Sequence, residues 1–175
     1  MKKQASRYRT SLDLTCGYLE IKISREYDKD LAWYYDLLKE VYHESSIVPV
    51  CSAYARDLHV DNAPIVFLFN SWDISHTYIC TSDYPQWKDE FCVIFCDTEM
   101  HDNYLTHELL HQFGAIDLYD YNQEGVEKVA KKYFPSSDML TVSHAIDDLT
   151  AYLVGWTDTL SAKAQKFLKE TEGQR

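Results

Sequence analysis

The chain has 175 residues, of which 46% are hydrophobic, and it carries a formal net charge of −11 with a pI near 4.9. A chain of this length and apolar content can bury a sizeable core, and no repeat or low-complexity linker divides it, so we expect one domain over residues 1–175. The acidic balance argues against nucleic acid as a partner, because phosphates attract surfaces rich in Lys and Arg.

The first half of the chain predicts mostly strands. An alternating apolar pattern predicts a strand at Tyr18–Ser24. Apolar residues then recur at helical spacing from about Asp28 to Glu44, with Asp28 or Asp30 as the N-cap. Short apolar runs predict four further strands, at Val50–Arg56, Ile65–Phe69, Thr77–Thr81 and Phe91–Cys96.

A helical segment that follows these strands reads HELLHQFGAID. Positions i and i+4 of a helix share a face, so His107 and His111 can present imidazole nitrogens to one metal ion. Glu108 would lie beside the metal, where a general base for a zinc-bound water must lie. Gly114 can end the helix in a left-handed conformation, after which Asp117 can come round as a third ligand. The fourth tetrahedral position is then left for water, as in a catalytic zinc site.

Chance is a poor explanation of this spacing. A chance HExxH in a chain of this composition has a probability of roughly two per cent, and the added glycine and third ligand lower it to below ~0.0001. The alternative, in which both histidines are ordinary helix residues beside a helix-ending glycine, is therefore disfavoured.

HELLHQFGAID resembles the zinc-binding consensus HExxHxxGxx(H/D) of the metzincin metallopeptidases, in the variant with an aspartate ligand found in snapalysin-like enzymes. The resemblance implies one catalytic Zn²⁺ held by His107, His111 and Asp117, with Glu108 as the catalytic residue. Metzincins also carry a methionine turn, whose Met lies beneath the metal ligands as an apolar floor. The segment from Phe134 to Leu140 is rich in turn-forming residues and offers Met139 for this structural role.

The same resemblance implies an α+β, zincin-like fold with a mixed twisted sheet and an active-site helix. The upper subdomain would span about residues 1–114, with Thr77–Thr81 as an edge strand that holds extended substrate over the cleft by backbone pairing. Residues from about 115 to 175 would form a smaller, mainly helical lower subdomain. Its predicted helices are Gln123–Tyr133, Ser143–Val154 and Ser161–Glu170.

The chain departs from the family pattern in two places. Asp117 replaces the histidine of most members, which removes one positive charge from a loaded site and makes the bound water slightly less acidic. Thr141 stands where several branches have a tyrosine that assists the transition state. Tyr119, Tyr121 and His144 are candidates for stabilising the oxyanion instead. With 14 Tyr in the chain, a tyrosine near the motif is more often a packing residue.

Signals for export or membrane insertion are missing. The N-terminal segment MKKQASRYRTSLDLTCG has no apolar core, and no apolar run approaches the ~18 residues of a membrane helix. The five scattered cysteines fit reduced core residues better than a disulfide framework. We therefore expect a cytoplasmic protein without a membrane partner, while secretion after removal of a preceding segment stays open.

The leading hypothesis is a small zinc endopeptidase acting on peptide or protein substrates, in which Glu108 takes the water's proton and passes it to the leaving amine. A catalytically silent zinc-binding domain that acts as an interaction or regulatory module is the alternative, and the intact Glu108 disfavours it. A domain without any metal is a third interpretation. Substrate preference and oligomeric state stay open at this point.

Overall fold

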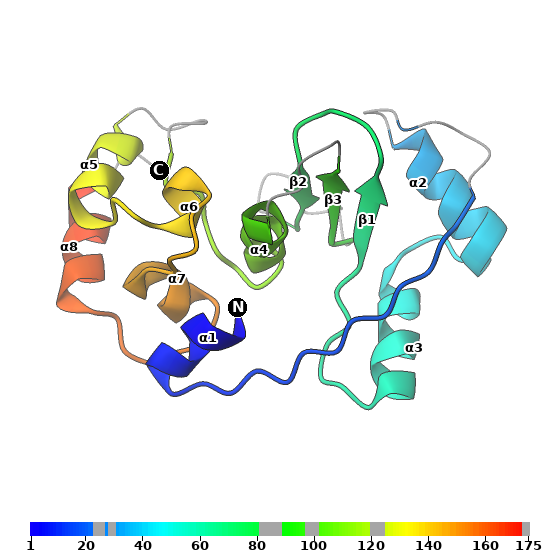
Figure 1. Cartoon of the computed structure of the whole chain (residues 1–175), viewed down its shortest axis with the longest axis horizontal. Coiled ribbons are helices and arrows are strands. Elements are labelled where there is room, and N and C mark those ends of the chain that lie inside the picture. Colours follow the sequence, from blue (N-terminus) through cyan, green and yellow to red (C-terminus); the bar gives the residue numbers. More distant parts are fainter. Residues whose placement is uncertain (23–26, 28–30, 81–88, 97–101, 120–124, 173–175) are drawn as a thin grey trace.

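The described part of the computed structural model comprises residues 1–22, 27, 31–80, 89–96, 102–119 and 125–172. Within these residues the chain forms a small α+β fold with a three-stranded mixed sheet and several helices. Helix α4 (Asp102–His111), which carries both motif histidines, lies between the sheet and a group of C-terminal helices (Figure 1). No described helix is long and apolar enough to cross a membrane.

The sheet has the order β1-β3-β2. Its central strand β3 (Phe91–Phe95) is buried along its whole length, as expected for a continuous apolar run. Strand β1 (Val66–Phe69) pairs with β3 in parallel, and β2 (His76–Tyr78) pairs with it antiparallel, with Thr77 opposite Cys92. Three predicted strands are therefore present, and the one containing Thr77 lies at a sheet edge.

The predicted strand Tyr18–Ser24 is wrong in its described part, because residues 18–22 form no regular element. Tyr18 is 81% exposed and Leu19 is 58% exposed, so the apolar alternation buries no face against a partner strand. Residues 23 and 24 lie outside the described part of the chain.

The predicted strand Val50–Arg56 is also wrong, since these residues lie inside helix α3 (Val48–Leu58). Pro49 occupies the first turn of this helix, where the fixed backbone angle of proline favours a helix start and its missing N–H costs nothing. The neighbouring valines resemble a strand, but the proline decides the local structure.

The predicted helix from Asp28 to Glu44 is shorter in the structure. It comprises α2 (Ala32–Leu37), which continues into a π-helical turn, η2 (Leu38–Tyr42). The two proposed N-cap residues, Asp28 and Asp30, lie outside the described residues. The buried face of α2 packs against the sheet in an aromatic core cluster that contains Trp33, Tyr34, Phe91, Val93 and Phe95.

Among the described residues, four helices follow the HELLHQFGAID segment, and three of them begin at an oxygen-bearing cap. They are α5 (Val126–Tyr133), α6 (Asp138–Thr141), α7 (Asp148–Leu153) and α8 (Ala162–Glu170). The side chains of Ser137, Asp147 and Ser161 accept hydrogen bonds from the first backbone N–H groups of α6, α7 and α8. Because Asp147 caps α7, this helix starts later than the predicted Ser143.

The first residues of the chain pack on these C-terminal helices. Helix α1 (Lys2–Ala5) and the 3₁₀ turn η1 (Ser6–Tyr8) lie beside α7, and the following segment runs back toward α2 (Figure 1). Ala5 is fully buried in the C-terminal core cluster, and Thr10 Oγ1 donates a hydrogen bond to the Trp156 carbonyl at 2.8 Å. The same cluster contains Leu110, Leu118 and Met139, and it therefore joins α4 to the C-terminal helices.

Candidate metal centre

The C-terminal end of α4 is a Schellman motif built around Gly114. Gly114 has a φ of 95°, in the left-handed region that glycine adopts without strain. Its N–H donates to the His111 carbonyl at 3.0 Å, and the Ala115 N–H donates to the Leu110 carbonyl at 3.1 Å. These bonds reverse the chain as the sequence predicts, and they bring Asp117 back to the histidine face of the helix.

His107, His111 and Asp117 form a cluster that could hold a metal ion. The two histidine Nε2 atoms lie 3.3 Å apart. Asp117 Oδ1 lies 3.2 Å from Nε2 of His107 and 3.3 Å from Nε2 of His111. The three atoms thus form a nearly equilateral triangle, so the carboxylate of Asp117 points to where the third ligand is needed.

Backbone carbonyls fix the orientation of both imidazoles. Nδ1 of His107 lies 3.0 Å from the Asp138 carbonyl oxygen, and Nδ1 of His111 lies 2.9 Å from the Ala115 carbonyl oxygen. A carbonyl can only accept, so each Nδ1 carries the proton and donates. Each Nε2 is therefore left with its lone pair directed at the centre of the cluster, as metal-binding histidines require.

This arrangement leaves three electron-pair donors facing one another. Asp117 Oδ1 is buried and, with both Nδ1 atoms protonated, has no hydrogen-bond donor among the described residues. In a tetrahedral complex the distance between two ligand atoms is about 1.6 times the metal–ligand bond, so the observed triangle corresponds to bonds of about 2.0 Å. The residues present therefore fit a cation that bridges all three.

The electrostatics of the cluster also favour a bound cation. Burial disfavours the charged form of each histidine. In that form, however, Nε2 gains a proton that it can donate to Asp117, and this bond, the carbonyl bonded to Nδ1 and the nearby carboxylate charge together raise the pKa of His107 and of His111. Burial of Asp117 opposes its ionisation, yet the two imidazoles hold its pKa far below the usual range. The carboxylate is thus charged over most of the pH scale, and a proton or a metal ion is stabilised beside it.

Asp138 and Met139 begin helix α6, which packs on α4. Met139 is fully buried in the core cluster that also contains Leu110 of α4, and its carbonyl accepts a hydrogen bond from the Leu118 N–H at 2.9 Å. The side chain of Asp138 is fully buried, and neither carboxyl oxygen has a hydrogen-bond partner among the described residues. Burial raises the pKa of Asp138 to about 7. The segment that contains Met139 thus supplies the carbonyl that orients His107, while Met139 itself packs in the core cluster with Leu110 of α4.

Glu108 lies on the side of α4 that faces the sheet. It is 7% exposed, and its Oε2 atom lies 2.8 Å from Oγ1 of Thr77 in the edge strand β2. The same hydroxyl lies 2.7 Å from the backbone carbonyl of Glu108. Glu108 is therefore anchored to the sheet and does not belong to the triangle formed by His107, His111 and Asp117.

The proposed oxyanion-stabilising residues have different positions. The Tyr119 ring stacks on the His107 imidazole, with centroids 6.3 Å apart and an interplanar angle of 16°. His144 is exposed, and its backbone carbonyl accepts a hydrogen bond from Gln4 Nε2, with no described side-chain contact to the cluster. Tyr121 lies outside the described residues, and Thr141 donates its hydroxyl to the Ser137 carbonyl. Of these residues, Tyr119 alone has a described contact with a ligand of the cluster.

The residues that support the cluster lie far from the motif in the chain. Thr77 and the Asp138 carbonyl contact motif residues from 31 positions away in the chain. Their types are unremarkable in a strand or a helical turn, so no local pattern indicates either contact. The position of Asp138 next to Met139 is the one signal that points to this turn.

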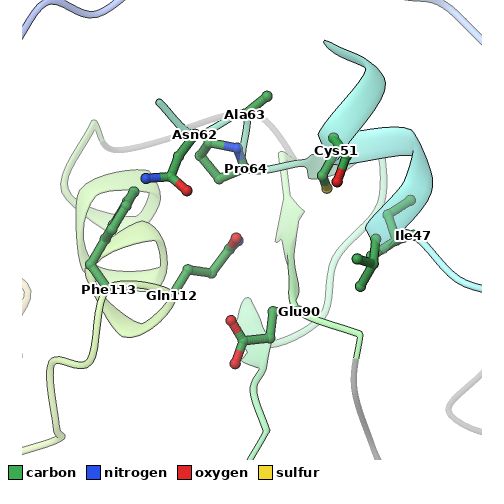
Figure 2. Close-up of a pocket in the computed structure, with 10 residues that line it drawn as sticks. Ile47, Cys51, Asn62, Ala63, Pro64, Glu90, Gln112 and Phe113 are labelled. Carbon is green, nitrogen blue, oxygen red and sulfur yellow. The ribbon is translucent and has the colours of Figure 1, made fainter. Parts of the chain in front are cut away.

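A shallow pocket lies apart from the cluster. Figure 2 shows it between the start of α3, with Cys51 and the N-cap residue Ile47, and the end of α4, where Gln112 and Phe113 face Asn62 and Pro64. Gln112 Nε2 also donates to the Cys92 sulfur at 2.7 Å. None of the three cluster residues lines this pocket, and it adds nothing to the metal site.

Comparisons of the chain with protein-family models, with curated proteins and with solved structures find no match. The chemistry of the site is therefore read from its own residues.

Proposed function

We propose that this chain is a zinc-dependent endopeptidase with a metzincin-like fold, in which His107, His111 and Asp117 hold one Zn²⁺ and Glu108 is the general base. The observation that carries the proposal is the triangle of three electron-pair donors, 3.2–3.3 Å apart, formed beside a glutamate of the same helix. The three donors would hold a Lewis acid and Glu108 would act as the proton acceptor, which together are the two parts of a hydrolytic site.

The donor set favours zinc, together with other transition metals, over calcium and magnesium. Calcium and magnesium prefer oxygen ligands, whereas imidazole suits zinc and its transition-metal neighbours. Zinc bonds to imidazole nitrogen and carboxylate oxygen measure about 2.0–2.2 Å, which agrees with the bond length that the triangle implies. Three protein ligands are typical of catalytic zinc sites, while structural sites have four. Among the described residues, three side chains converge on the cluster.

The residues of the site have separate roles in the proposed reaction. Zinc, when bound, supplies a Lewis acid and lowers the pKa of water. Glu108 accepts the proton of the attacking water and delivers it to the leaving amine. Tyr119, stacked on His107, is the described candidate for stabilising negative charge on the substrate oxygen. The edge strand β2 lies beside α4, where it can pair with the backbone of an extended peptide.

One observation favours a catalytically silent zinc-binding domain as the second candidate. Glu108 is nearly buried and hydrogen-bonded to Thr77, an arrangement that a purely structural glutamate would share. In that case the cluster would hold zinc to stabilise an interaction or regulatory module. The two candidates differ in whether Glu108 is needed for turnover.

Substitution of Glu108 separates the two candidates. Glu108→Gln should keep about one zinc per chain and lower the hydrolysis of a quenched fluorescent peptide library by at least about 100-fold. Glu172→Gln, at an exposed position, is the matched control and should hydrolyse the library like the parent. Equal hydrolysis by the parent and Glu108→Gln would refute the mechanism. Zinc binding without hydrolysis in the parent would identify the silent domain.

A further inference from the structure

The edge strand β2 places a single hydroxyl against the glutamate of the HExxH segment. Thr77 lies opposite Cys92 in the β2–β3 register, and its Oγ1 atom lies 3.4 Å from the Cys92 sulfur. The same Oγ1 lies 2.8 Å from Glu108 Oε2 and 2.7 Å from the Glu108 carbonyl oxygen. Cys92 is fully buried and Glu108 is 7% exposed, so this contact lies in an environment with little water.

The Thr77 hydroxyl has one proton but three possible acceptors, and the Glu108 carboxylate is the strongest of them. A threonine hydroxyl has one proton and two lone pairs, so it cannot fully donate to the carbonyl, the carboxylate and the sulfur together. Hydrogen bonds to a charged carboxylate are roughly twice as strong as those to neutral acceptors, and sulfur is a weak acceptor. Both Glu108 oxygens, the carbonyl oxygen and Oε2, lie within donating distance of the hydroxyl, and the charge of the carboxylate favours Oε2 as the acceptor.

We infer that Thr77 is a positioning residue for Glu108, which fixes Oε2 against the sheet and thereby leaves Oε1 to exchange a proton with water and the leaving group. The inference rests on the proposed function of the cluster. A proton-transferring carboxylate must lie within hydrogen-bond reach of the reacting atoms, and a misplacement of about 1 Å can cost on the order of 100-fold in rate.

A hydroxyl suits this task better than a cationic partner would. It donates to the carboxylate, and it can accept from the carboxylic acid while its own proton turns to the Glu108 carbonyl at 2.7 Å. The contact between Thr77 and Glu108 can thus persist when the glutamate carries the proton from water to amine. A lysine or arginine would hold the carboxylate in its charged form and oppose that transfer.

Thr77 could instead have a purely structural role, in which it provides a hydrogen bond to buried polar atoms of α4. Loss of the hydroxyl would then lower stability without a specific effect on turnover. Two variants separate the possibilities. Thr77→Val keeps the shape and the strand propensity of the residue but removes the hydroxyl, and Thr77→Ser keeps the hydroxyl.

The kinetic test combines these variants with Glu108→Gln. In zinc-loaded protein, Thr77→Val should lower kcat on the order of 100-fold with KM within about twofold, while Thr77→Ser should retain kcat within about threefold. In the Glu108→Gln background, Thr77→Val should cause almost no further loss, because residues that act as a unit are not additive. An unchanged kcat, or an equal loss in both backgrounds, would overturn the inference.

A readout that needs no turnover keeps the inference distinct from the proposed function. Crystal structures of the zinc-loaded parent and Thr77→Val should each contain about one zinc per chain, with the Glu108 carboxylate displaced in the variant. A carboxylate that keeps its position in Thr77→Val would overturn the inference even if the protein hydrolyses no peptide. If the parent binds zinc but hydrolyses none of the peptides, the peptidase proposal fails, and the carboxylate position still decides the role of Thr77.

Discussion

The carboxylate of Asp117 lies 3.2 Å from the Nε2 atom of His107, although a helix end and a reversal of the chain separate the two residues. The contact depends on the left-handed backbone of Gly114, which turns the chain after the last histidine. Asp117 is the residue whose role the sequence leaves most open. Its position beside both imidazoles makes it the third member of the cluster.

The charge of Asp117 should dominate metal affinity. Asp117→Asn keeps the size of the side chain but removes its negative charge, and it replaces a carboxylate by an amide, which is a weaker metal ligand. Loss of a supporting contact around a metal already costs about 10–100-fold, so we expect zinc affinity to fall by at least about 100-fold. Competition with a fluorescent zinc chelator measures this change. Asp158→Asn, at an exposed site, is the control and should bind zinc like the parent; unaltered affinity in Asp117→Asn would exclude the carboxylate as a ligand.

Gly114→Ala should weaken both the fold and the metal site. A φ of 95° strains any residue with a Cβ, which costs about 1–2 kcal/mol of unfolding free energy. Relaxation of that strain would shift Asp117 away from the histidines. Urea unfolding and zinc titration check the two effects.

Gly155→Ala is the matched control for this prediction. Gly155 has a φ of 75° and open space around the position of an added Cβ, so it shares the backbone strain of Gly114. It precedes no ligand of the cluster. We expect a similar loss of stability with zinc affinity preserved, and equal loss of zinc affinity in both variants would refute the positioning role of Gly114.

The features that the sequence predicted correctly are those that depend on residues close together in the chain. The spacing of His107, His111 and Gly114 specifies one helix face and a left-handed helix end, and both are present. The runs that contain β1 and β3 are apolar throughout, and helix α8 lies within the predicted range Ser161–Glu170. In these cases, a few adjacent residues decide the structure.

The features that the sequence did not predict depend on contacts far along the chain. Val50–Arg56 resembles a strand until Pro49 is weighed as a helix-starting residue. Thr77 and Asp138 contact the motif only because β2 and α6 pack on α4. No periodicity in one sequence encodes such packing, so the supporting residues of a site are harder to predict than its ligands.

Metal affinity should fall as the solution becomes acidic. In the metal-free cluster, Asp117 raises the pKa of both histidines above the ordinary 6.5 despite their burial. Protons therefore compete with zinc for Nε2 already near neutral pH, and affinity should drop by about tenfold or more per unit below it. Titration with Zn²⁺ at pH 7.5 and pH 5.5 measures the dependence, and equal affinities at the two values would contradict it.

The metal-free protein should show the opposite trend in stability. The raised histidine pKa contributes stability that is present below pH 6.5 and lost as pH rises through the folded-state pKa. The lowered pKa of Asp117 contributes stability above about pH 3.8 that is lost as pH falls through its folded-state pKa. Urea unfolding with a chelator present should therefore show that the cluster adds to the free energy of unfolding between about pH 4 and pH 6.5. In Asp117→Asn this contribution should vanish.

The buried carboxyl of Asp138 should destabilise the metal-free fold at alkaline pH. Burial raises its pKa from 3.8 to about 7, so its ionisation costs stability progressively as pH rises toward 7 and fully above it. Asp138→Asn should remove this cost, so the difference in unfolding free energy between variant and parent should grow in favour of the variant by roughly 2.5 kcal/mol as the pH rises from 5 to 8. Chemical unfolding at both pH values checks this, and a difference between parent and variant that does not change with pH would count against it.

The metal content of protein purified without added metal is the most direct test of the central claim, that His107, His111 and Asp117 hold a zinc ion. Elemental analysis should find about one zinc per chain in the parent and in Glu108→Gln, and almost none when His107 and His111 are both replaced by alanine. A parent without zinc that also fails to bind added Zn²⁺, or full zinc content in the double alanine variant, would contradict the account.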